Sequence, residues 1–409
     1  MFAAIAQGKS RVSHFLNGSD CLATAQVMRD LGVDITVIDS STLIIEGNGR
    51  HGLLEPKDVL DCANSGTTIR LMCGLLCAQN FFSVMSGSEQ IRRRPMGRVI
   101  APLQELGAHI HGRESDRLAP IAIAPSTKLI GKTHNLGVAS AQVKSALILA
   151  GLYASGETVI LEPGPSRDHS ERLSSAMGAR FTKETSSIIV SPLNADLLPF
   201  DMKVAGDPSS AAFLIAAALM VQGSHIQLRD MSVNATRTGF MKAAQVMGAK
   251  VEIHNEREHL NEPVADVSVA FGDLKGATFS GDIIVRMIDE LPILAVLATQ
   301  AKGETIIKDA KELKVKETNR IDTTVSELRK MGAKIEALDD GFAIEGPTQL
   351  KGAHVTSHSD HRLAMAMTIA GLCADGSTTV DGAEVTVDSF PGFVSTLRSL
   401  GADISEENL

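Results

Sequence analysis

Residues 323–335 read Thr323-Thr-Val-Ser-Glu-Leu-Arg-Lys-Met-Gly-Ala-Lys-Ile335, and the last five positions of this stretch recur along the chain. Each copy has Leu or Met, then Gly, then Ala or Val, then any residue, then an apolar residue. The copies are spaced roughly 70 to 85 residues apart. They are Leu31–Ile35, Leu106–Ile110, Met177–Phe181, Met247–Val251, Met331–Ile335 and Leu400–Ile404. We therefore expect six copies of one structural unit.

The residues before each motif have the periodicity of an amphipathic helix, as Val325, Leu328 and Met331 do in the quoted stretch. The Gly follows where the end of a helix commonly requires a positive φ. An alternating apolar and polar pattern after it is typical of a strand. Each motif therefore predicts a helix that ends at a glycine and leads into a strand.

A second element alternates with the first: a nearly all-apolar helix, a Gly turn and a strand. A helix that is apolar on every side is a buried helix. We expect a β-α-β-α-β-β unit, and an α/β fold of two inside-out domains of three repeats each, with parallel buried helices inside and sheets outside. The expected domains are residues 1–204 and 205–409. The copies are Ser145–Ile160, Ala211–Leu228, Leu291–Ile307 and Arg362–Val380, with a looser one at Thr67–Val84.

The first copy of this buried helix is incomplete. Residues 1–15 match only its last turns and the strand that follows them. By comparison with the other copies, we expect roughly 25 to 30 residues of the repeat to be missing before Met1. Either the start is misassigned or the chain is truncated.

Composition excludes several classes of protein. The net charge is -9, and the sequence has no Trp and one Tyr, so it offers neither the positive charge nor the stacking platforms that nucleic acid requires. No apolar run reaches the roughly 18 to 20 residues of a membrane span. The five Cys form no CxxC pair. We expect a soluble protein of the cytoplasm.

Polar segments open the buried helices, and several contain a cation. Residues 206–210 need no explanation beyond helix capping. Capping does not explain Arg70, Lys144 or Arg362, because a cation at a helix N-terminus opposes the helix dipole unless an anion lies between them. The sequence therefore predicts two small anions in a cleft between the domains.

These segments closely resemble the 5-enolpyruvylshikimate-3-phosphate synthase family, also called 3-phosphoshikimate 1-carboxyvinyltransferase. The resemblance extends from Ala3 to about Gly401. The motifs that carry it are Asn64-Ser-Gly-Thr-Thr-Ile-Arg70, Arg94-Pro95, Ser140-Ala-Gln-Val-Lys-Ser145, Ser166-Arg-Asp-His-Ser-Glu-Arg172, Ile288-Asp-Glu290, Val315-Lys-Glu-Thr-Asn-Arg320 and Asp360-His-Arg362. The family fold is also two inside-out domains of three repeats.

The resemblance implies transfer of the enolpyruvyl group of phosphoenolpyruvate to the 5-hydroxyl of shikimate 3-phosphate, a step of the shikimate pathway that glyphosate inhibits. It implies small-molecule partners, a monomer, and neither a metal nor an organic cofactor. Asp289 is the expected base and Glu317 the expected acid. The expected shikimate 3-phosphate ligands are Ser140, Gln142, Ser166, Asp289 and Lys316, and the expected phosphoenolpyruvate ligands are Gly66, Arg94, Gln142, Arg320 and Arg362.

Two alternatives stay open. The family segment whose Lys contacts both ligands would lie before Met1, and losing such a charge typically lowers the rate roughly 100-fold to 1,000-fold. The chain is then impaired, or is a non-catalytic anion-binding fragment. The other alternative is the sister enolpyruvyl transferase that acts on UDP-N-acetylglucosamine. Its reactive Cys has no counterpart in the loop Ser88-Glu-Gln-Ile91.

Overall fold

All six repeated glycines follow the end of a helix and have a positive φ in the computed structural model, which describes residues 1–126 and 128–407. Their φ angles range from 84° to 104°. A positive φ is strained for a residue that has a Cβ and is readily adopted by Gly, which has none. The predicted helix ends are confirmed at Gly32, Gly107, Gly178, Gly248, Gly332 and Gly401.

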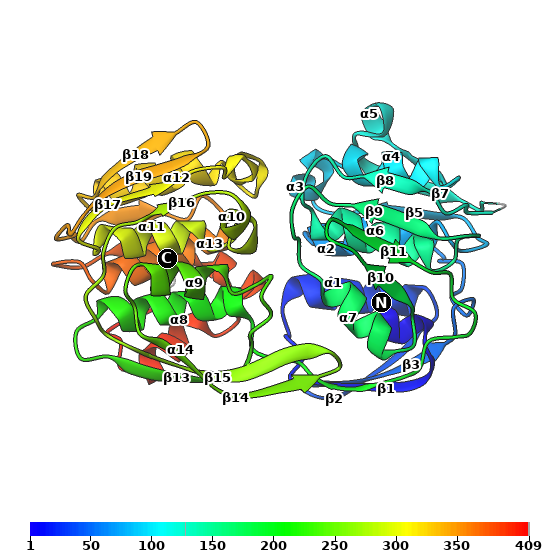
Figure 1. Ribbon diagram of the computed structural model, residues 1–409, viewed down its shortest axis with the longest axis horizontal. Coiled ribbons are helices and arrows are strands. Elements are labelled where there is room, and N and C mark those ends of the chain that lie inside the picture. Colours follow the sequence, from blue (N-terminus) through cyan, green and yellow to red (C-terminus); the bar gives the residue numbers. More distant parts are fainter. Residues whose placement is uncertain (127, 408–409) are drawn as a thin grey trace. The chain divides into compact units, whose positions relative to one another are not determined.

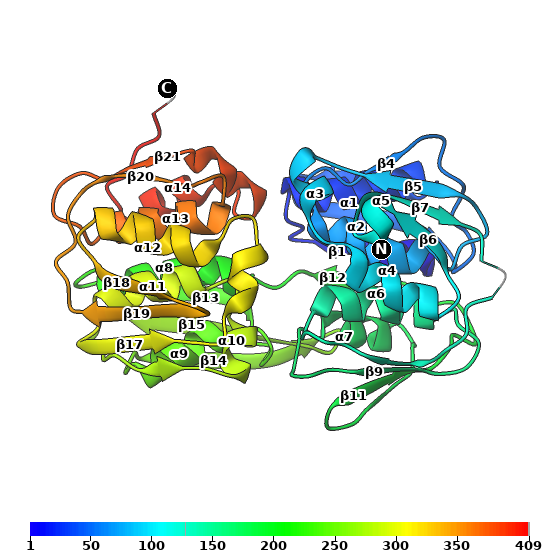
Figure 2. The same cartoon turned by 90° about the horizontal axis from the view of Figure 1, so that it is seen from above.

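The chain divides into two compact units. The first contains residues 1–204 together with residues 258–262, and the second contains residues 205–257 and everything described from residue 263 onward. The short segment 258–262 contains the end of one strand, a two-residue turn and the first residue of the next strand. Nothing in the repeat pattern indicates that it belongs with the first unit. Figure 1 and Figure 2 show both units.

Three four-stranded sheets are described in the first unit. In spatial order, one contains β12 (Asp201–Lys203), β1 (Gln7–Ser13), β3 (Thr42–Asn48) and β2 (Asp34–Asp39). The next contains β4 (Leu60–Asp61), β5 (Ser83–Ser86), β7 (Leu118–Ala124) and β6 (His109–Gly112). The last contains β10 (Phe181–Lys183), β11 (Ser187–Val190), β9 (Thr158–Leu161) and β8 (Thr133–Asn135).

The helices of this unit are of two kinds. The buried ones are the 3-10 helix η1 (Phe2–Ile5), α2 (Gly66–Leu76) and α6 (Ala141–Gly151). In Figure 1 and Figure 2, α2 and α6 lie inside the unit with strands around them. The amphipathic ones are α1 (Ser19–Asp30), α4 (Gly97–Glu105) and α7 (His169–Ala176), and the short ones are α3 (Glu89–Arg93) and α5 (Arg113–Asp116).

The second unit repeats this plan. Its described sheets, in spatial order, are β13 (His225–Ser232), β15 (Glu262–Ala270) and β14 (Val251–His259); β16 (Thr278–Phe279), β17 (Gly303–Ile307), β19 (Gly341–Gly346) and β18 (Lys334–Leu338); and β20 (His354–Thr356) with β21 (Thr379–Asp381). The amphipathic helices are α9 (Gly239–Val246), α12 (Arg320–Lys330) and α14 (Phe393–Ser399), and the short ones are α10 (Asp282–Arg286), η2 (Lys311–Val315) and η3 (Ala383–Asp388).

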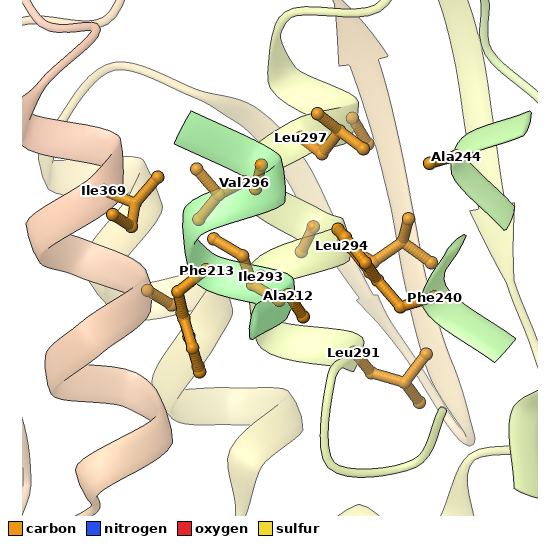
Figure 3. Close-up of a cluster of buried hydrophobic side chains, with 14 of the residues drawn as sticks. Ala212, Phe213, Phe240, Ala244, Leu291, Ile293, Leu294, Val296, Leu297 and Ile369 are labelled. Carbon is orange, nitrogen blue, oxygen red and sulfur yellow. The ribbon is translucent and has the colours of Figure 1, made fainter. Parts of the chain in front are cut away.

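The core of this unit is made by α8 (Pro208–Met220), α11 (Leu291–Thr299) and α13 (His361–Gly371). Figure 3 shows side chains of these helices and of α9 gathered in one cluster, among them Phe213, Phe240, Leu294 and Ile369. Every residue of α11 is buried, as its all-apolar sequence predicts. Burial of each large apolar side chain contributes about 1.5 to 3 kcal/mol.

Within residues 1–126 and 128–407, no helix is long and apolar enough to cross a membrane.

The repeat is also visible in how the strands pair. In the sheets that contain β4, β8 and β16, a strand before the buried helix pairs in parallel with the strand after it, and two antiparallel partners follow. The first sheet has the same pattern, but β12 takes the place of the strand before the helix. The α/β architecture expected from the sequence is confirmed.

Candidate functional site

The start of α2 forms the first part of the candidate site. The Ser65 hydroxyl accepts the N–H of Thr68 at 3.1 Å and caps the helix. Gly66, the first helical residue, lies against two guanidinium groups. A Cβ added to Gly66 would be 2.8 Å from Nη1 of Arg70 and 3.1 Å from Nη1 of Arg94. Gly66 is therefore the small residue that lets Arg70 and Arg94 approach the helix N-terminus.

Gln142, on the first turn of α6, is held from two sides. Arg70 Nη1 donates to its Oε1 at 2.9 Å, and its Nε2 donates to Oγ1 of Thr67 at 3.0 Å. Arg70 is 1% exposed, so its orientation is fixed by packing. It also donates to the carbonyl of Pro95 at 3.4 Å. Arg70 thus connects the starts of α2 and α6 with the segment that carries Arg94.

The other predicted ligands of the first unit lie nearby along the chain. Ser140 is the N-cap residue of α6, and its side chain makes no capping hydrogen bond. Ser166 lies between β9 and α7, where its hydroxyl donates to Oε1 of Glu162. Lys144 differs from the sequence-based expectation that the helix-start cations hold a ligand anion. It is 1% exposed and contacts Glu162 and Glu171, so carboxylates of the chain itself surround it.

In the second unit, Arg320 connects the starts of α12, α13 and α11. It begins α12, is 1% exposed, and donates to both carboxylate oxygens of Asp360, the N-cap of α13, at 2.7 and 3.1 Å. It also donates to Glu317 Oε2 at 2.7 Å and to Asp289 Oδ1 at 3.4 Å. Lys316 Nζ donates to the same Asp289 oxygen at 3.0 Å. The two predicted proton-transfer carboxylates therefore share one guanidinium.

The charges of this cluster shift pKa values strongly. Burial would lower the pKa of Arg320, but the carboxylates of Asp360, Glu317 and Asp289 outweigh burial and hold it above its ordinary value. Burial would raise the pKa of Asp360, but Arg320 outweighs burial and lowers it. His361, next in the chain, has its pKa lowered to about 4, first by burial and then by Arg362 and Arg320. Its imidazole is therefore neutral near pH 7.

Arg362 lies on the first turn of α13. Its backbone N–H donates to Oδ1 of Asp360 at 2.9 Å, and its guanidinium carbon is 5.9 Å from the centre of the Phe213 ring on α8. Its Nη1 is buried, and residues 1–126 and 128–407 provide no hydrogen-bond partner for it. A buried donor without an acceptor is costly. An anion bound at this helix start would supply the acceptor.

Asp207 is a residue whose contacts the sequence did not indicate. It caps α8 through the N–H groups of Ser209 and Ser210, as expected. It also accepts from Arg237 at 2.5 Å. Burial would raise its pKa, but the positive charges of Arg237 and Arg362 lower it. Asp207 therefore balances part of the charge of Arg362.

Among residues 1–126 and 128–407, no group of three or more His, Cys, Asp or Glu side chains could hold a metal ion. The donors that gather at the helix starts are guanidinium, ammonium, hydroxyl and amide groups, which suit phosphate and carboxylate groups.

Comparisons of the sequence and of the structure with known proteins all identify the same family. The model of the EPSP synthase (3-phosphoshikimate 1-carboxyvinyltransferase) family matches residues 1–397. The 3-phosphoshikimate 1-carboxyvinyltransferase of Thermodesulfovibrio yellowstonii is 47% identical over 98% of this chain and 93% of its own length. That of Desulforudis audaxviator is 48% identical over the same shares. An EPSP synthase structure from Acinetobacter baumannii superimposes with a TM-score of 0.89 and 39% identity, covering 98% of this chain and 92% of that one.

Proposed function

This chain belongs to the EPSP synthase family, and from that membership we propose that it transfers the enolpyruvyl group of phosphoenolpyruvate to the 5-hydroxyl of shikimate 3-phosphate. The hydroxyl oxygen adds to C2 of phosphoenolpyruvate while the C3 methylene takes a proton. Loss of phosphate and of a methyl proton then restores the double bond. The reaction needs groups that hold two anions and groups that move protons.

Phosphoenolpyruvate carries a phosphate and a carboxylate, and we assign these anions to Gly66, Arg94, Gln142, Arg320 and Arg362. The buried Nη1 of Arg362 carries this assignment, since it is a donor that has no acceptor in residues 1–126 and 128–407. The N–H groups at the starts of α2 and α13 add partial positive charge. Gly66 contributes by its small size, because a larger residue would displace Arg70 and Arg94.

Shikimate 3-phosphate is assigned to Ser140, Gln142, Ser166, Asp289 and Lys316. Gln142 is common to both ligands, and its fixed orientation supports that role. Asp289 is the proposed base, and Lys316 and Arg320 hold its carboxylate in place at 3.0 and 3.4 Å. The roles of these residues are proposals that the contacts support.

Glu317 is the proposed acid for the methylene carbon. Its carboxylate accepts from Arg320 at 2.7 Å. An anion that binds Arg320 competes with Glu317 for the N–H donors of that guanidinium. Binding of phosphoenolpyruvate would thus free the Glu317 carboxylate to take and give a proton.

The proposed setting is a monomer in the cytoplasm that acts on small molecules and requires no cofactor. Both substrates carry several negative charges and do not cross a bilayer unaided, so they are available in the compartment that makes them. Size-exclusion chromatography with light scattering tests the monomer.

Phosphate release tests the function directly. The purified chain is incubated with phosphoenolpyruvate and either shikimate 3-phosphate or UDP-N-acetylglucosamine. We expect phosphate to be released when the acceptor is shikimate 3-phosphate and not when it is UDP-N-acetylglucosamine. Mass spectrometry should then detect the carboxyvinyl product of shikimate 3-phosphate. Release with the UDP-sugar instead would assign the chain to the sister reaction. Calorimetric binding of shikimate 3-phosphate without any release would leave only an anion-binding protein.

A further inference from the structure

Lys144 is a buried cation on α6, and its ammonium lies close to three oxygen atoms. They are Glu162 Oε2 at 3.2 Å, Glu171 Oε1 at 2.9 Å and the carbonyl oxygen of Ser166 at 3.4 Å. An ammonium group removed from water costs several kcal/mol unless such partners compensate it. Lys144 is therefore fixed in position by the segment that joins β9 to α7 and by α7 itself.

Ser166 is attached to this cluster at two points. Its carbonyl accepts from Lys144, and its hydroxyl donates to Glu162 Oε1, while the other oxygen of Glu162 contacts Lys144. Both polar ends of Ser166 thus depend on the Lys144–Glu162 pair. A bound phosphate that accepts a hydrogen bond from the Ser166 hydroxyl replaces Glu162 as the acceptor of that bond. Glu162 then loses one hydrogen bond, but its negative charge is still balanced by Lys144.

Lys144 also connects two segments with proposed ligands of shikimate 3-phosphate. Ser140 is the N-cap residue of α6 and Gln142 lies on its first turn, so both precede Lys144 by four residues or fewer. A second contact fixes the same helix pair, since the hydroxyls of Ser145 on α6 and Ser170 on α7 are 2.6 Å apart. The lysine therefore sets the position of Ser166 relative to the start of α6.

We propose that Lys144 is a positioning residue for shikimate 3-phosphate that acts through Glu162 and Ser166. This inference rests on the proposed function, because it takes Ser166 as a ligand of shikimate 3-phosphate. The rival explanation is that Lys144 only balances buried carboxylates and stabilises the fold.

Glu171 provides the matched control. It contacts the same ammonium, whereas the hydroxyl of Ser166 donates to Glu162. Burial raises the pKa of Glu171 more than Lys144 lowers it. Glu171→Gln removes one carboxylate from beside Lys144 and leaves the contact between Ser166 and Glu162 in place.

The test is a double-mutant cycle with the Kd of shikimate 3-phosphate measured by calorimetry, so turnover is not required. The variants are Lys144→Met, Ser166→Ala and the two combined, with Glu171→Gln as the control. Ser166→Ala should raise the Kd about 10-fold or more, the loss expected for a hydrogen bond to a charged group. Lys144→Met should raise it about 10-fold, and Glu171→Gln less than about 2-fold.

The coupling between the effects of Lys144→Met and Ser166→Ala on the Kd shows whether Lys144 positions Ser166 or only stabilises the fold. If Lys144 acts through Ser166, adding Lys144→Met to Ser166→Ala raises the Kd by less than about 2-fold. The proposal would be overturned if the Kd increase of the double variant equalled the product of the two single increases. It would also be overturned if Lys144→Met lowered the melting temperature but left the Kd unchanged. No effect of Ser166→Ala would also remove Ser166 from the proposed ligands. An effect of Ser166→Ala without one of Lys144→Met overturns the role of Lys144 alone.

Should Lys144→Met fail to fold, Glu162→Gln takes its place in the same cycle. It keeps Lys144 paired with Glu171 and removes the charged link to Ser166. The expected Kd increase and its loss in the Ser166→Ala background are the same. An unchanged Kd for Glu162→Gln would overturn the proposal.

Discussion

Arg320 and Asp360 form a buried two-point pair, with Nε of Arg320 2.7 Å from Oδ2 and Nη2 3.1 Å from Oδ1. Asp360 also caps α13, so one carboxylate holds both the Arg320 side chain and the helix that begins with His361. This pair connects the start of α12 to the start of α13.

Asp360→Asn should lower stability by about 2 kcal/mol, because Asn still caps the helix but leaves the buried guanidinium with one fewer charged partner. Glu317 and Asp289 limit the loss. Urea unfolding measures it. Asp381→Asn is the control, since the exposed pair of Asp381 with His354 at 3.0 Å should contribute less than about 1 kcal/mol. Equal losses in both variants would contradict the role given to Asp360.

Gly66→Ala should raise the KM for phosphoenolpyruvate roughly 10-fold, an effect of about 1.4 kcal/mol. The added methyl would lie 2.8 Å from Arg70 and 3.1 Å from Arg94, so both guanidinium groups must move. We expect a smaller change, below about 3-fold, in the KM for shikimate 3-phosphate. Gly272→Ala is the control, because a Cβ there meets nothing within 4 Å. An unchanged KM in Gly66→Ala would remove Gly66 from the proposed site.

Arg362→Met should lower kcat/KM for phosphoenolpyruvate roughly 100-fold to 1,000-fold without lowering the melting temperature. The substitution removes a buried donor that has no acceptor in the described residues, and Asp207 keeps its contact with Arg237. Kinetics and differential scanning fluorimetry measure the two effects. Arg229→Met, at an exposed position of β13, should change neither. A large fall in melting temperature for Arg362→Met would identify a structural role.

Stability should fall with acidity because of His361. Its pKa is about 4 in the folded chain and 6.5 in the unfolded chain, so the unfolded state binds more protons between these values. The contribution is complete above about pH 6.5 and is lost as the pH falls to about 4. Since the ring is partly exposed, we expect a loss of about 2 kcal/mol.

Unfolding of the parent chain and of His361→Gln at pH 4.5 and pH 7.5 measures this loss. The variant should show a weaker dependence on pH by about that amount. Identical pH dependence in the two proteins would show that His361 is not held neutral.

The sequence predicts the fold well, because repeats and helix periodicity are local signals. The glycine of each motif requires a positive φ whatever surrounds it, and an all-apolar segment such as α11 must be buried. The partners of the charged residues depend instead on tertiary contacts. Nothing in the local sequence indicates that Arg237 reaches Asp207, or that Lys144 is enclosed by Glu162 and Glu171.

For the candidate site, the sequence identifies residues but not their contacts. The sequence leads us to expect that Arg320, Glu317 and Asp289 all act on the ligands. In the structure, Arg320 donates hydrogen bonds to the carboxylates of Glu317 and Asp289. The sequence identifies Arg70 as a cation at a helix start, whereas its contact with Gln142 follows only from the packing of α2 against α6. The individual ligand assignments stay predictions.

The pairing of β12 with β1 has a consequence during synthesis. The N–H of Phe200 reaches the hydroxyl of Ser10 at 3.2 Å across 190 positions of the chain. At translation speeds of roughly 5 to 20 residues per second, this edge of β1 waits roughly 10 to 40 s for its partner. An open strand edge can pair with other chains. The nascent polypeptide therefore passes through an aggregation-prone interval that ends only when residues 201–203 have left the ribosome.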